Sequence, residues 1–266
     1  LPLPPGYPGS RQACEEILAT KPWHWLAWYR GEAQLNFEVP PASVPAETTA
    51  DHIREVNAVV HAKNELIDDA IGQVLDYVAT RGWDADTDIL YTTDHGELQG
   101  DYGMLFKGPY HVNALTQVPL IWRPAPSAKI AAAEVPEPVG HVDIAPTIMR
   151  AAGLDVPDWM QGRPLPSAPG DSSRERVVTE WIDSYDGNEI VLQTLVRDGY
   201  LVTAYGKTNR YTGDEGELYN LTDDPHQWRN LWDDPAAAAI KYDLLDDLRQ
   251  HLPEGRAKPL PKVAPV

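Results

Sequence analysis

The stretch Ile89-Leu90-Tyr91-Thr92-Thr93-Asp94-His95-Gly96-Glu97 decides how the rest of the chain is interpreted. Its first four residues are apolar, aromatic or β-branched and predict a short strand, and Asp94 and His95 follow that strand almost directly. Ligands of open α/β sheets bind beyond the carboxyl ends of the strands. A carboxylate beside an imidazole at such a place is half of a divalent-metal site, so Asp94 and His95 are the candidate metal ligands.

A lysine follows this stretch at a distance that suits the same site. The loop around Gly100 and Gly103 can fold Lys107 back over the candidate ligands, where its ammonium would bind an anionic substrate oxygen or stabilise a leaving group. His111 is a further candidate substrate-binding residue, with an ordinary loop position as the alternative. Asp-His-Gly alone is also common in turns after strands, and a single lysine is ordinarily a solvated surface residue. The metal-site hypothesis therefore depends on the order of these features together.

Outward from the site, the pattern predicts an α/β arrangement. A long amphipathic helix is expected over residues 50–80, before the strand, and a second apolar strand over 118–122. A helix followed by an apolar strand, found twice, predicts a mostly parallel sheet flanked by helices. Another helix is expected to open near Asp143.

The pattern changes in the second half of the chain. Residues 156–173 are rich in Pro, Gly and Ser and are expected to form a linker. Alternating residues then predict antiparallel strands, with Asp198-Gly199 as a hairpin turn, and residues 235–252 predict a closing helix. The expected organisation is an α/β core portion over 1–155, a linker over 156–173, a small antiparallel α+β subdomain over 174–252 and a tail over 253–266.

Composition narrows the classes of partner. The 40 acidic residues against 22 basic ones give a net charge of -18, which argues against nucleic-acid binding. We expect no membrane partner, because no stretch is apolar over the length that crosses a bilayer. The single cysteine, Cys14, excludes an internal disulfide and favours a cytoplasmic location, although the compartment is otherwise open.

Taken together, the motifs resemble the sulfatase family of the alkaline phosphatase superfamily. Five segments in the family's order carry the resemblance, namely Thr92–Glu97, Phe106–Gly108, Val118–Ile121, Val142–Thr147 with Ala152-Gly153, and Glu217–Leu221 with Asp224-Pro225. Asp-His in place of the commoner Asp-Asn is similar to the branch that holds phosphonate monoester hydrolases and related arylsulfatases.

The resemblance implies an alkaline-phosphatase-like α/β core, here a partial one, and a smaller C-terminal antiparallel subdomain. Asp94 and His95 match the family's second pair of metal ligands, and Lys107 matches the catalytic lysine that contacts the sulfate or phosphate group and its leaving oxygen. The implied cofactor is one divalent metal, Ca²⁺ first, with Mn²⁺ or Mg²⁺ as alternatives. The implied partner is a small-molecule sulfate or phosphonate ester, and a homo-oligomer stays open.

Two departures from the family pattern concern the nucleophile and the metal ligands. The family makes a formylglycine from Cys or Ser in Cys/Ser-x-Pro-x-Arg, whereas the only cysteine here lies in Cys14-Glu15-Glu16-Ile17-Leu18. The family's first acidic metal ligands have no counterpart either. We therefore interpret the chain as the C-terminal portion of a formylglycine-type sulfuric ester hydrolase, with the nucleophile segment expected upstream. The alternatives are a phosphonate monoester hydrolase or phosphodiesterase of the same superfamily, including its two-zinc enzymes, and a non-catalytic binding protein on the same fold.

Overall fold

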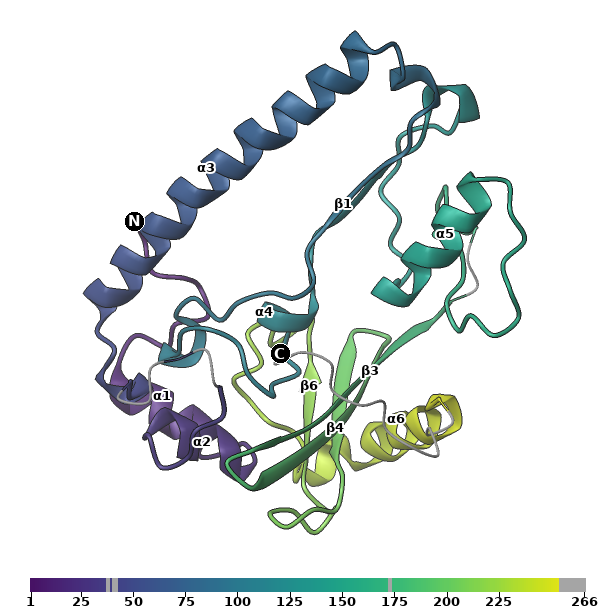
Figure 1. Cartoon of the computed structure of the whole chain (residues 1–266). Helices are drawn as coiled ribbons and strands as arrows, with labels where there is room; N and C mark the ends of the chain where they lie inside the picture. The colour runs from purple at the N-terminus through teal and green to yellow at the C-terminus, as the bar shows by residue number, and fades with distance from the viewer. Residues whose placement is uncertain (37–38, 40–42, 172–173, 254–266) are drawn as a thin grey trace.

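The computed structural model describes residues 1–36, 39, 43–171 and 174–253 (Figure 1). Two short helices, α1 (Arg11–Leu18) and α2 (Trp23–Tyr29), precede the long helix α3 (Ala50–Thr80). A two-stranded sheet of β1 (Ile89–Thr92) and β2 (Leu120–Arg123) follows, with the short helix α4 (Asn113–Thr116) between its strands, and then comes α5 (Ile144–Ala151). The second sheet contains β3 (Arg176–Tyr185), β4 (Asn188–Arg197), β5 (Tyr200–Tyr205) and β6 (Gly216–Asn220), and α6 (Ala238–His251) follows it.

The first sheet differs from the prediction. Strands β1 and β2 pair antiparallel, from Ile89 opposite Arg123 to Thr92 opposite Leu120, so the expected parallel arrangement is wrong for this pair. A parallel pair needs a crossover connection, usually a full helix packed on the sheet. Here the connection over residues 93–119 holds a folded-back loop, a 3₁₀ turn at Asp101–Gly103 and the one-turn helix α4, and the chain returns in the opposite direction.

Helix α3 forms where the sequence predicted it, but it does not cover a sheet of this chain. Thr49 caps it, because its hydroxyl accepts from the backbone N–H of His52 at 3.2 Å. Only two of its residues, Ile53 and Asn57, are buried, whereas Leu66 is 68% exposed. Figure 1 shows α3 along one edge of the molecule, apart from the four-stranded sheet. Neither α3 nor any other described helix is long and apolar enough to span a bilayer.

The second sheet is antiparallel throughout, with the strand order β3-β4-β5-β6. The expected turn at Asp198-Gly199 joins β4 to β5, and both residues have the positive φ angles, 52° and 75°, that such a tight hairpin turn requires. A second Asp-Gly pair, at 186–187, joins β3 to β4 in the same way. The alternating pattern thus predicted strands over 176–182, 193–197 and 200–205 that lie within β3, β4 and β5.

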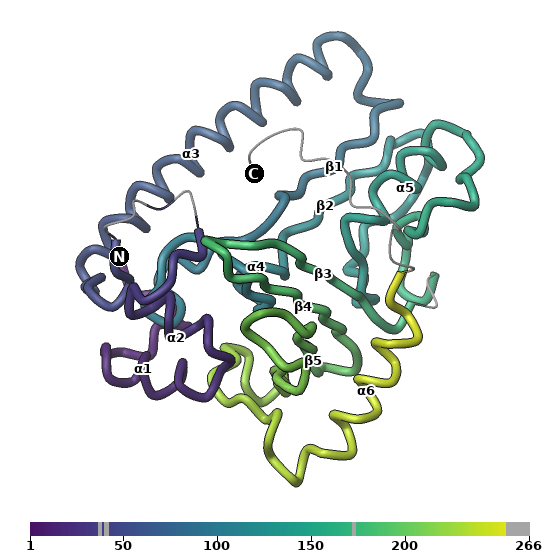
Figure 2. Tube along the Cα trace, turned by 60° about the horizontal axis from the view of Figure 1, so that its bottom comes forward, coloured from purple at the N-terminus to yellow at the C-terminus, as the bar shows by residue number. Residues whose placement is uncertain are grey.

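The two faces of this sheet bury different parts of the chain. One face, with Leu192 and Tyr205, joins a core that includes Trp25 and Trp28 of α2. The other face packs against α6, so the sheet lies between α1–α2 and α6 (Figure 2). Because the first core contains residues from both halves of the chain, the domain boundaries expected at residues 155 and 173 stay a prediction, and the tail over 254–266 lies outside the described residues.

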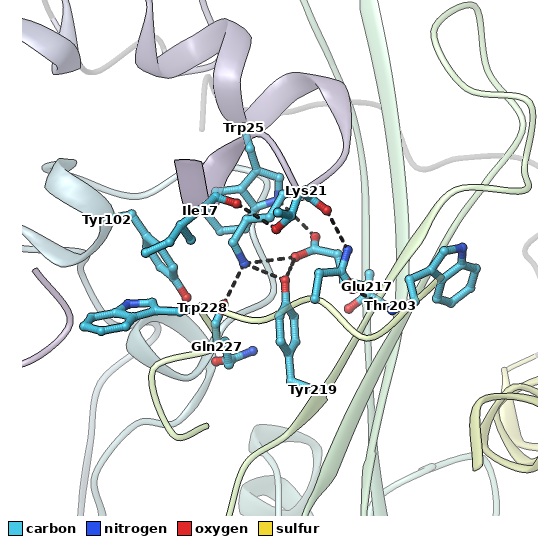
Figure 3. Close-up of polar contacts among 12 residues, drawn as sticks. Ile17, Lys21, Trp25, Tyr102, Thr203, Glu217, Tyr219, Gln227 and Trp228 are labelled. Atoms are coloured by element: carbon cyan, nitrogen blue, oxygen red, sulfur yellow. Dashed lines mark hydrogen bonds and ion pairs between the residues drawn. The ribbon is translucent and has the colours of Figure 1, made fainter. Parts of the chain in front are cut away.

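A buried ion pair connects the α1–α2 segment to β6 (Figure 3). Lys21 is 7% exposed, and its Nζ donates to Tyr219 Oη at 2.5 Å and to the carbonyl oxygen of Gln227 at 2.9 Å. Its distance to Glu217 Oε2 is 3.5 Å. Tyr205 and Tyr219 donate their hydroxyls to the Glu217 carboxylate, and Trp25 Nε1 donates at 3.0 Å. Every oxygen of the buried carboxylate therefore has partners, as buried charges require.

The ionisation of the pair follows from these contacts. Burial lowers the pKa of Lys21 to about 8, although Glu217 opposes that shift. Burial raises the pKa of Glu217, but Lys21 and the donated hydroxyls outweigh it, so the pKa of that carboxyl lies below its ordinary value. Both groups are thus charged at neutral pH, and the interaction that joins the α1–α2 connection to β6 is ionic.

Two buried histidines have pKa values that are shifted in the same direction. Burial lowers the pKa of His24 and of His111 to about 4, so both imidazoles are neutral in the folded chain. The Nδ1 of His111 lies 2.7 Å from Thr194 Oγ1, and the hydroxyl of Thr194 is 2.8 Å from that of Thr203.

The first prediction concerns the ion pair. Lys21→Met should lower the free energy of unfolding by about 3–5 kcal/mol, because it leaves the Glu217 carboxylate buried without its counter-charge. The measurement is urea denaturation at pH 7 followed by tryptophan fluorescence. The double variant Lys21→Met/Glu217→Gln, which removes both charges, should recover part of the loss. A loss below about 1 kcal/mol in the single variant would show that the pair is not a constraint on the fold.

The second prediction concerns the stability of the fold at acidic pH. The unfolded histidines bind protons below about pH 6.5, whereas the folded ones bind them only near pH 4, so stability should fall as the pH drops through this window. The loss should be on the order of 3 kcal/mol for each histidine, since one pKa unit corresponds to about 1.4 kcal/mol. Urea denaturation from pH 7.5 to 4.5 measures it. His111→Val should remove one histidine's share of the slope, and an unchanged slope would refute the assignment.

Candidate functional site

The candidate site begins with Asp94, two residues after the end of β1, at the start of the loop that leads to α4. Gly96 fixes the turn there, since its N–H donates to the Leu115 carbonyl at 2.9 Å. A β-carbon on Gly96 would lie 1.9 Å from the carbonyl oxygen of Ala114, so only glycine fits this close approach. Asp94 and His95 are therefore held between the end of a strand and a fixed turn, as the sequence predicted for residues beyond a strand end.

The side chains of Asp94 and His95 lie on the same side of this turn. Asp94 Oδ1 accepts the His95 backbone N–H at 3.0 Å and the Thr93 hydroxyl at 3.2 Å. Asp94 Oδ2 is 3.6 Å from His95 Nε2, and the Asp94 side chain is 83% exposed. An open carboxylate oxygen and a ring nitrogen thus lie next to each other at the surface.

The tautomer of His95 follows from its neighbours. Its Nδ1 is 2.8 Å from the Gly96 carbonyl oxygen, which can only accept, so Nδ1 carries the proton in the neutral ring. Its Nε2 is then the unprotonated nitrogen, whose lone pair is the one with which a neutral histidine binds metals. A carbonyl behind the ring and a carboxylate beside it make Nε2 and Asp94 Oδ2 suitable donors for one divalent cation.

Lys107 reaches the same point. Its Nζ lies 3.0 Å from His95 Nε2, so the loop does fold the lysine back onto the histidine. The folding uses residues with positive φ angles at Gly100 (112°), Tyr102 (57°) and Phe106 (68°). Leu98 N–H donates to the Phe106 carbonyl at 3.1 Å and closes the loop just before Lys107. A cationic group therefore already contacts the candidate ligand atom of His95.

Asp94 and His95 supply only part of the ligands that a metal ion needs. No group of three or more His, Cys, Asp or Glu side chains suited to a metal occurs among the residues that the structure describes. A hard divalent cation takes six or more ligands, so Asp94 and His95 fit such an ion but do not complete its coordination.

His111 lies in a different environment. It is 6% exposed and contacts Thr194 on β4, within the packing between the loop and the sheet. The structure thus places Asp94, His95 and Lys107 in one cluster and gives His111 a packing contact, and its substrate role stays a prediction.

Two further side chains at the site were not found from the sequence. Asn36 Nδ2 donates to the Lys107 carbonyl oxygen at 2.8 Å, and His24 Nε2 lies 2.9 Å from the Pro109 carbonyl oxygen. These donors are 71 and 85 residues away from their acceptors in the sequence, and neither belongs to a recognisable motif. No local signal in the sequence indicated the contacts.

Comparison with known proteins gives two overlapping family matches. The sulfatase family model matches residues 2–154, and the model described as N-sulphoglucosamine sulphohydrolase, C-terminal, matches residues 100–254. Among curated proteins, the chain is 26% identical over 247 residues to the uncharacterized sulfatase YidJ of Escherichia coli K12, covering 91% of this chain and 44% of that protein. It is 29% identical over 203 residues to the multifunctional alkaline phosphatase superfamily protein PehA of Trinickia caryophylli, covering 72% of this chain and 39% of PehA.

Solved structures agree on the fold. The phosphonate monoester hydrolase of Agrobacterium radiobacter superposes with a TM-score of 0.74 at 23% identity, over 93% of this chain and 51% of that protein. The chain spans about half the length of the proteins that it matches. Because the sulfatase model covers more than half of its residues, the chain belongs to the sulfatase family.

Proposed function

We propose that this chain supplies the second pair of metal ligands and the substrate-binding lysine of a formylglycine-type sulfuric ester hydrolase. The observation that carries the proposal is the cluster at the end of β1, where Lys107 Nζ lies 3.0 Å from His95 Nε2 and Asp94 Oδ2 lies 3.6 Å from the same nitrogen. Two candidate metal-binding atoms beside an ammonium suit an anionic substrate whose charge increases on the transferred group. Membership of the sulfatase family supports the same reading.

The residues of this chain have separate tasks in that reaction. Asp94 and His95 would hold one divalent cation, with Ca²⁺ proposed first and Mn²⁺ or Mg²⁺ next. Such an ion polarises the ester oxygens and lowers the pKa of a nucleophile. Lys107 would neutralise charge on the sulfate group or on the departing oxygen, because its ammonium donates three hydrogen bonds from a flexible stem. The Nδ1–H of His95, donating to the Gly96 carbonyl, keeps Nε2 directed at the site.

We also propose that the nucleophile and the remaining ligands belong to polypeptide outside these 266 residues. Three observations support this. Cys14 is buried within α1, and its sequence context lacks the Pro and Arg of the formylglycine motif. No cluster of three or more His, Cys, Asp or Glu side chains that could complete a metal site occurs among the described residues. The apolar side of α3 is exposed, including Val59, Leu66 and Val74, as expected of a surface that further polypeptide covers.

A second candidate function is hydrolysis of phosphonate or phosphate esters. The specific observation in its favour is the Asp94–His95 pair together with the similarity to a phosphonate monoester hydrolase and to a multifunctional protein of the alkaline phosphatase superfamily. Sulfate and phosphonate monoesters present similar anionic oxygens to Lys107, so these residues suit either substrate. Substrate profiling of the whole protein separates the two functions.

The third prediction tests the ligand pair. Mn²⁺ titrated into the ¹⁵N-labelled chain should broaden the amide signals of Asp94 and His95 first, with a Kd of about 0.1–1 mM, because two ligands bind a hard cation weakly. Asp94→Asn and His95→Phe should each weaken this binding at least about tenfold, since each removes half of the donor set. Asp68→Asn, a change on exposed α3, is the matched control. Broadening that is centred elsewhere, or that survives both substitutions, would exclude this site.

The fourth prediction concerns turnover. The 266-residue chain alone should not hydrolyse p-nitrophenyl sulfate or a phosphonate monoester in the presence of Ca²⁺, Mn²⁺ or Mg²⁺, because covalent catalysis requires the nucleophile. The assay is release of p-nitrophenol from the purified chain. Metal-dependent release that disappears in Asp94→Ala would show that the nucleophile lies within the chain after all.

A further inference from the structure

Two side chains, one on α2 and one in the loop after it, hydrogen-bond to the main chain around Lys107. Asn36 Nδ2 donates to the carbonyl oxygen of Lys107 at 2.8 Å, and His24 Nε2 lies 2.9 Å from the carbonyl oxygen of Pro109. The two acceptors flank Gly108, the residue directly after the lysine. Both donors are buried, with His24 fully enclosed and Asn36 5% exposed. These two contacts lie where water competes little, so they restrain the backbone more than surface contacts would.

The direction of the His24 contact is fixed by its surroundings. A carbonyl oxygen accepts only, so His24 Nε2 carries the proton, and Nδ1 accepts from the Tyr211 hydroxyl at 2.8 Å. The ring also stacks on Tyr110, with centroids 5.1 Å apart and an interplanar angle of 11°. The imidazole is therefore held in one orientation and one tautomer, with its N–H directed at Pro109.

Steric contacts restrain the same stretch of main chain further. A β-carbon on Gly108 would lie 2.6 Å from the Tyr110 ring, so the backbone between the two held carbonyls passes directly against an aromatic side chain. On the other side of Lys107, the Phe106 carbonyl accepts the Leu98 N–H at 3.1 Å. The lysine thus projects from a main chain that is restrained before and after it.

We propose that His24 and Asn36 are positioning residues for Lys107. They hold the carbonyls on either side of Gly108, and this sets the origin from which the lysine side chain reaches His95 Nε2. Neither residue touches the substrate in this account. The inference rests on the proposed function of Lys107 as the group that binds the transferred sulfate or phosphonate.

The ion pair of Lys21 and Glu217 connects the hydrogen bonds around Lys107 to the four-stranded sheet. Lys21 comes two residues before α2, and Trp25 of α2 donates to the same Glu217 carboxylate at 3.0 Å. His24 lies between them in the sequence, so the anchor on β6 also fixes the position of the imidazole. A displacement of α2 would carry the His24 donor away from Pro109.

The test measures how firmly Lys107 is held, without any need for turnover. The purified chain is acetylated with limiting acetic anhydride at pH 8, and the rate at each lysine is read by peptide mass spectrometry. Lys63 on exposed α3 is the internal reference, and buried Lys21 reports whether the fold is intact. The quantity compared between variants is the rate at Lys107 divided by the rate at Lys63.

Loss of either donor should release the lysine. Asn36→Leu keeps a similar volume but removes the amide, and His24→Phe keeps a ring on Tyr110 but removes both nitrogens. Each should raise the Lys107 to Lys63 ratio about three- to tenfold, the effect of losing one buried hydrogen bond. His24→Gln places an N–H close to the position of Nε2 and should return the ratio toward that of the parent chain.

The matched control is Asn188→Leu. Asn188 is also a buried asparagine whose Nδ2 donates to a main-chain carbonyl, that of Tyr185 at 3.0 Å, but in the β3–β4 turn. It should leave the ratio unchanged. An unchanged ratio in Asn36→Leu and His24→Phe, or an equal rise in Asn188→Leu, would overturn the proposal. If His24→Phe makes Lys21 reactive, Asn36→Leu and His24→Gln decide the matter.

Failure of this inference is distinguishable from failure of the proposed function. Metal broadening centred on Asp94 and His95 together with an unchanged acetylation ratio would reject the positioning role alone. If the parent chain binds no metal at Asp94 and His95 but the ratio rises in Asn36→Leu and His24→Phe, the positioning role stands and the metal site is rejected.

Discussion

The structure depends on one buried ion pair, between Lys21 and Glu217. An ammonium and a carboxylate taken out of water are stable only if their hydrogen-bonding capacity is filled, and here two tyrosines, a tryptophan and a backbone carbonyl fill it. Lys21 Nζ also lies 4.6 Å from the Trp25 ring and 4.9 Å from the Tyr102 ring. These partners come from α2, from the loop before Lys107, from strands β5 and β6 and from the segment after β6. The requirement to satisfy the pair therefore joins the N-terminal helices, the site loop and the antiparallel sheet in one place.

The candidate site uses this arrangement. Tyr102, beside the pair, donates its hydroxyl to the His226 carbonyl at 2.8 Å and so ties the site loop to the segment after β6. His24 and Asn36 contact the same loop on the other side of Lys107. The candidate ligand atoms lie on Asp94, which is exposed, and on His95, which is partly exposed; contacts within residues 93–96 and the contact with Lys107 hold them. A buried support beneath an open pair of candidate ligands suits the proposed site, in which other polypeptide would supply the remaining parts.

The sequence predicted the parts of the molecule that depend on local patterns. Strand alternation, the Asp198-Gly199 turn and the periodicity of α3 each reflect nearest-neighbour geometry, and the motif around Asp94, His95 and Lys107 gave the candidate site. The direction of β2 was predicted wrongly, because a strand's own residues do not encode whether its connection reverses the chain. The partners of Glu217 and of the Lys107 carbonyl could not be predicted, since Lys21 and Asn36 are 196 and 71 residues away from them. Such contacts are specified by the packing of whole elements.

The measurement that tests this account most directly is an anomalous diffraction experiment on crystals of the chain soaked in Mn²⁺. The account predicts one anomalous peak within coordination distance of Asp94 Oδ2 and His95 Nε2. It also predicts that Lys107 Nζ leaves Nε2 while the Lys107 and Pro109 carbonyls stay on Asn36 and His24. A peak at another place on the chain would contradict the metal site. A peak at the predicted place with the Lys107 main chain detached from both donors would contradict the role of the buried framework.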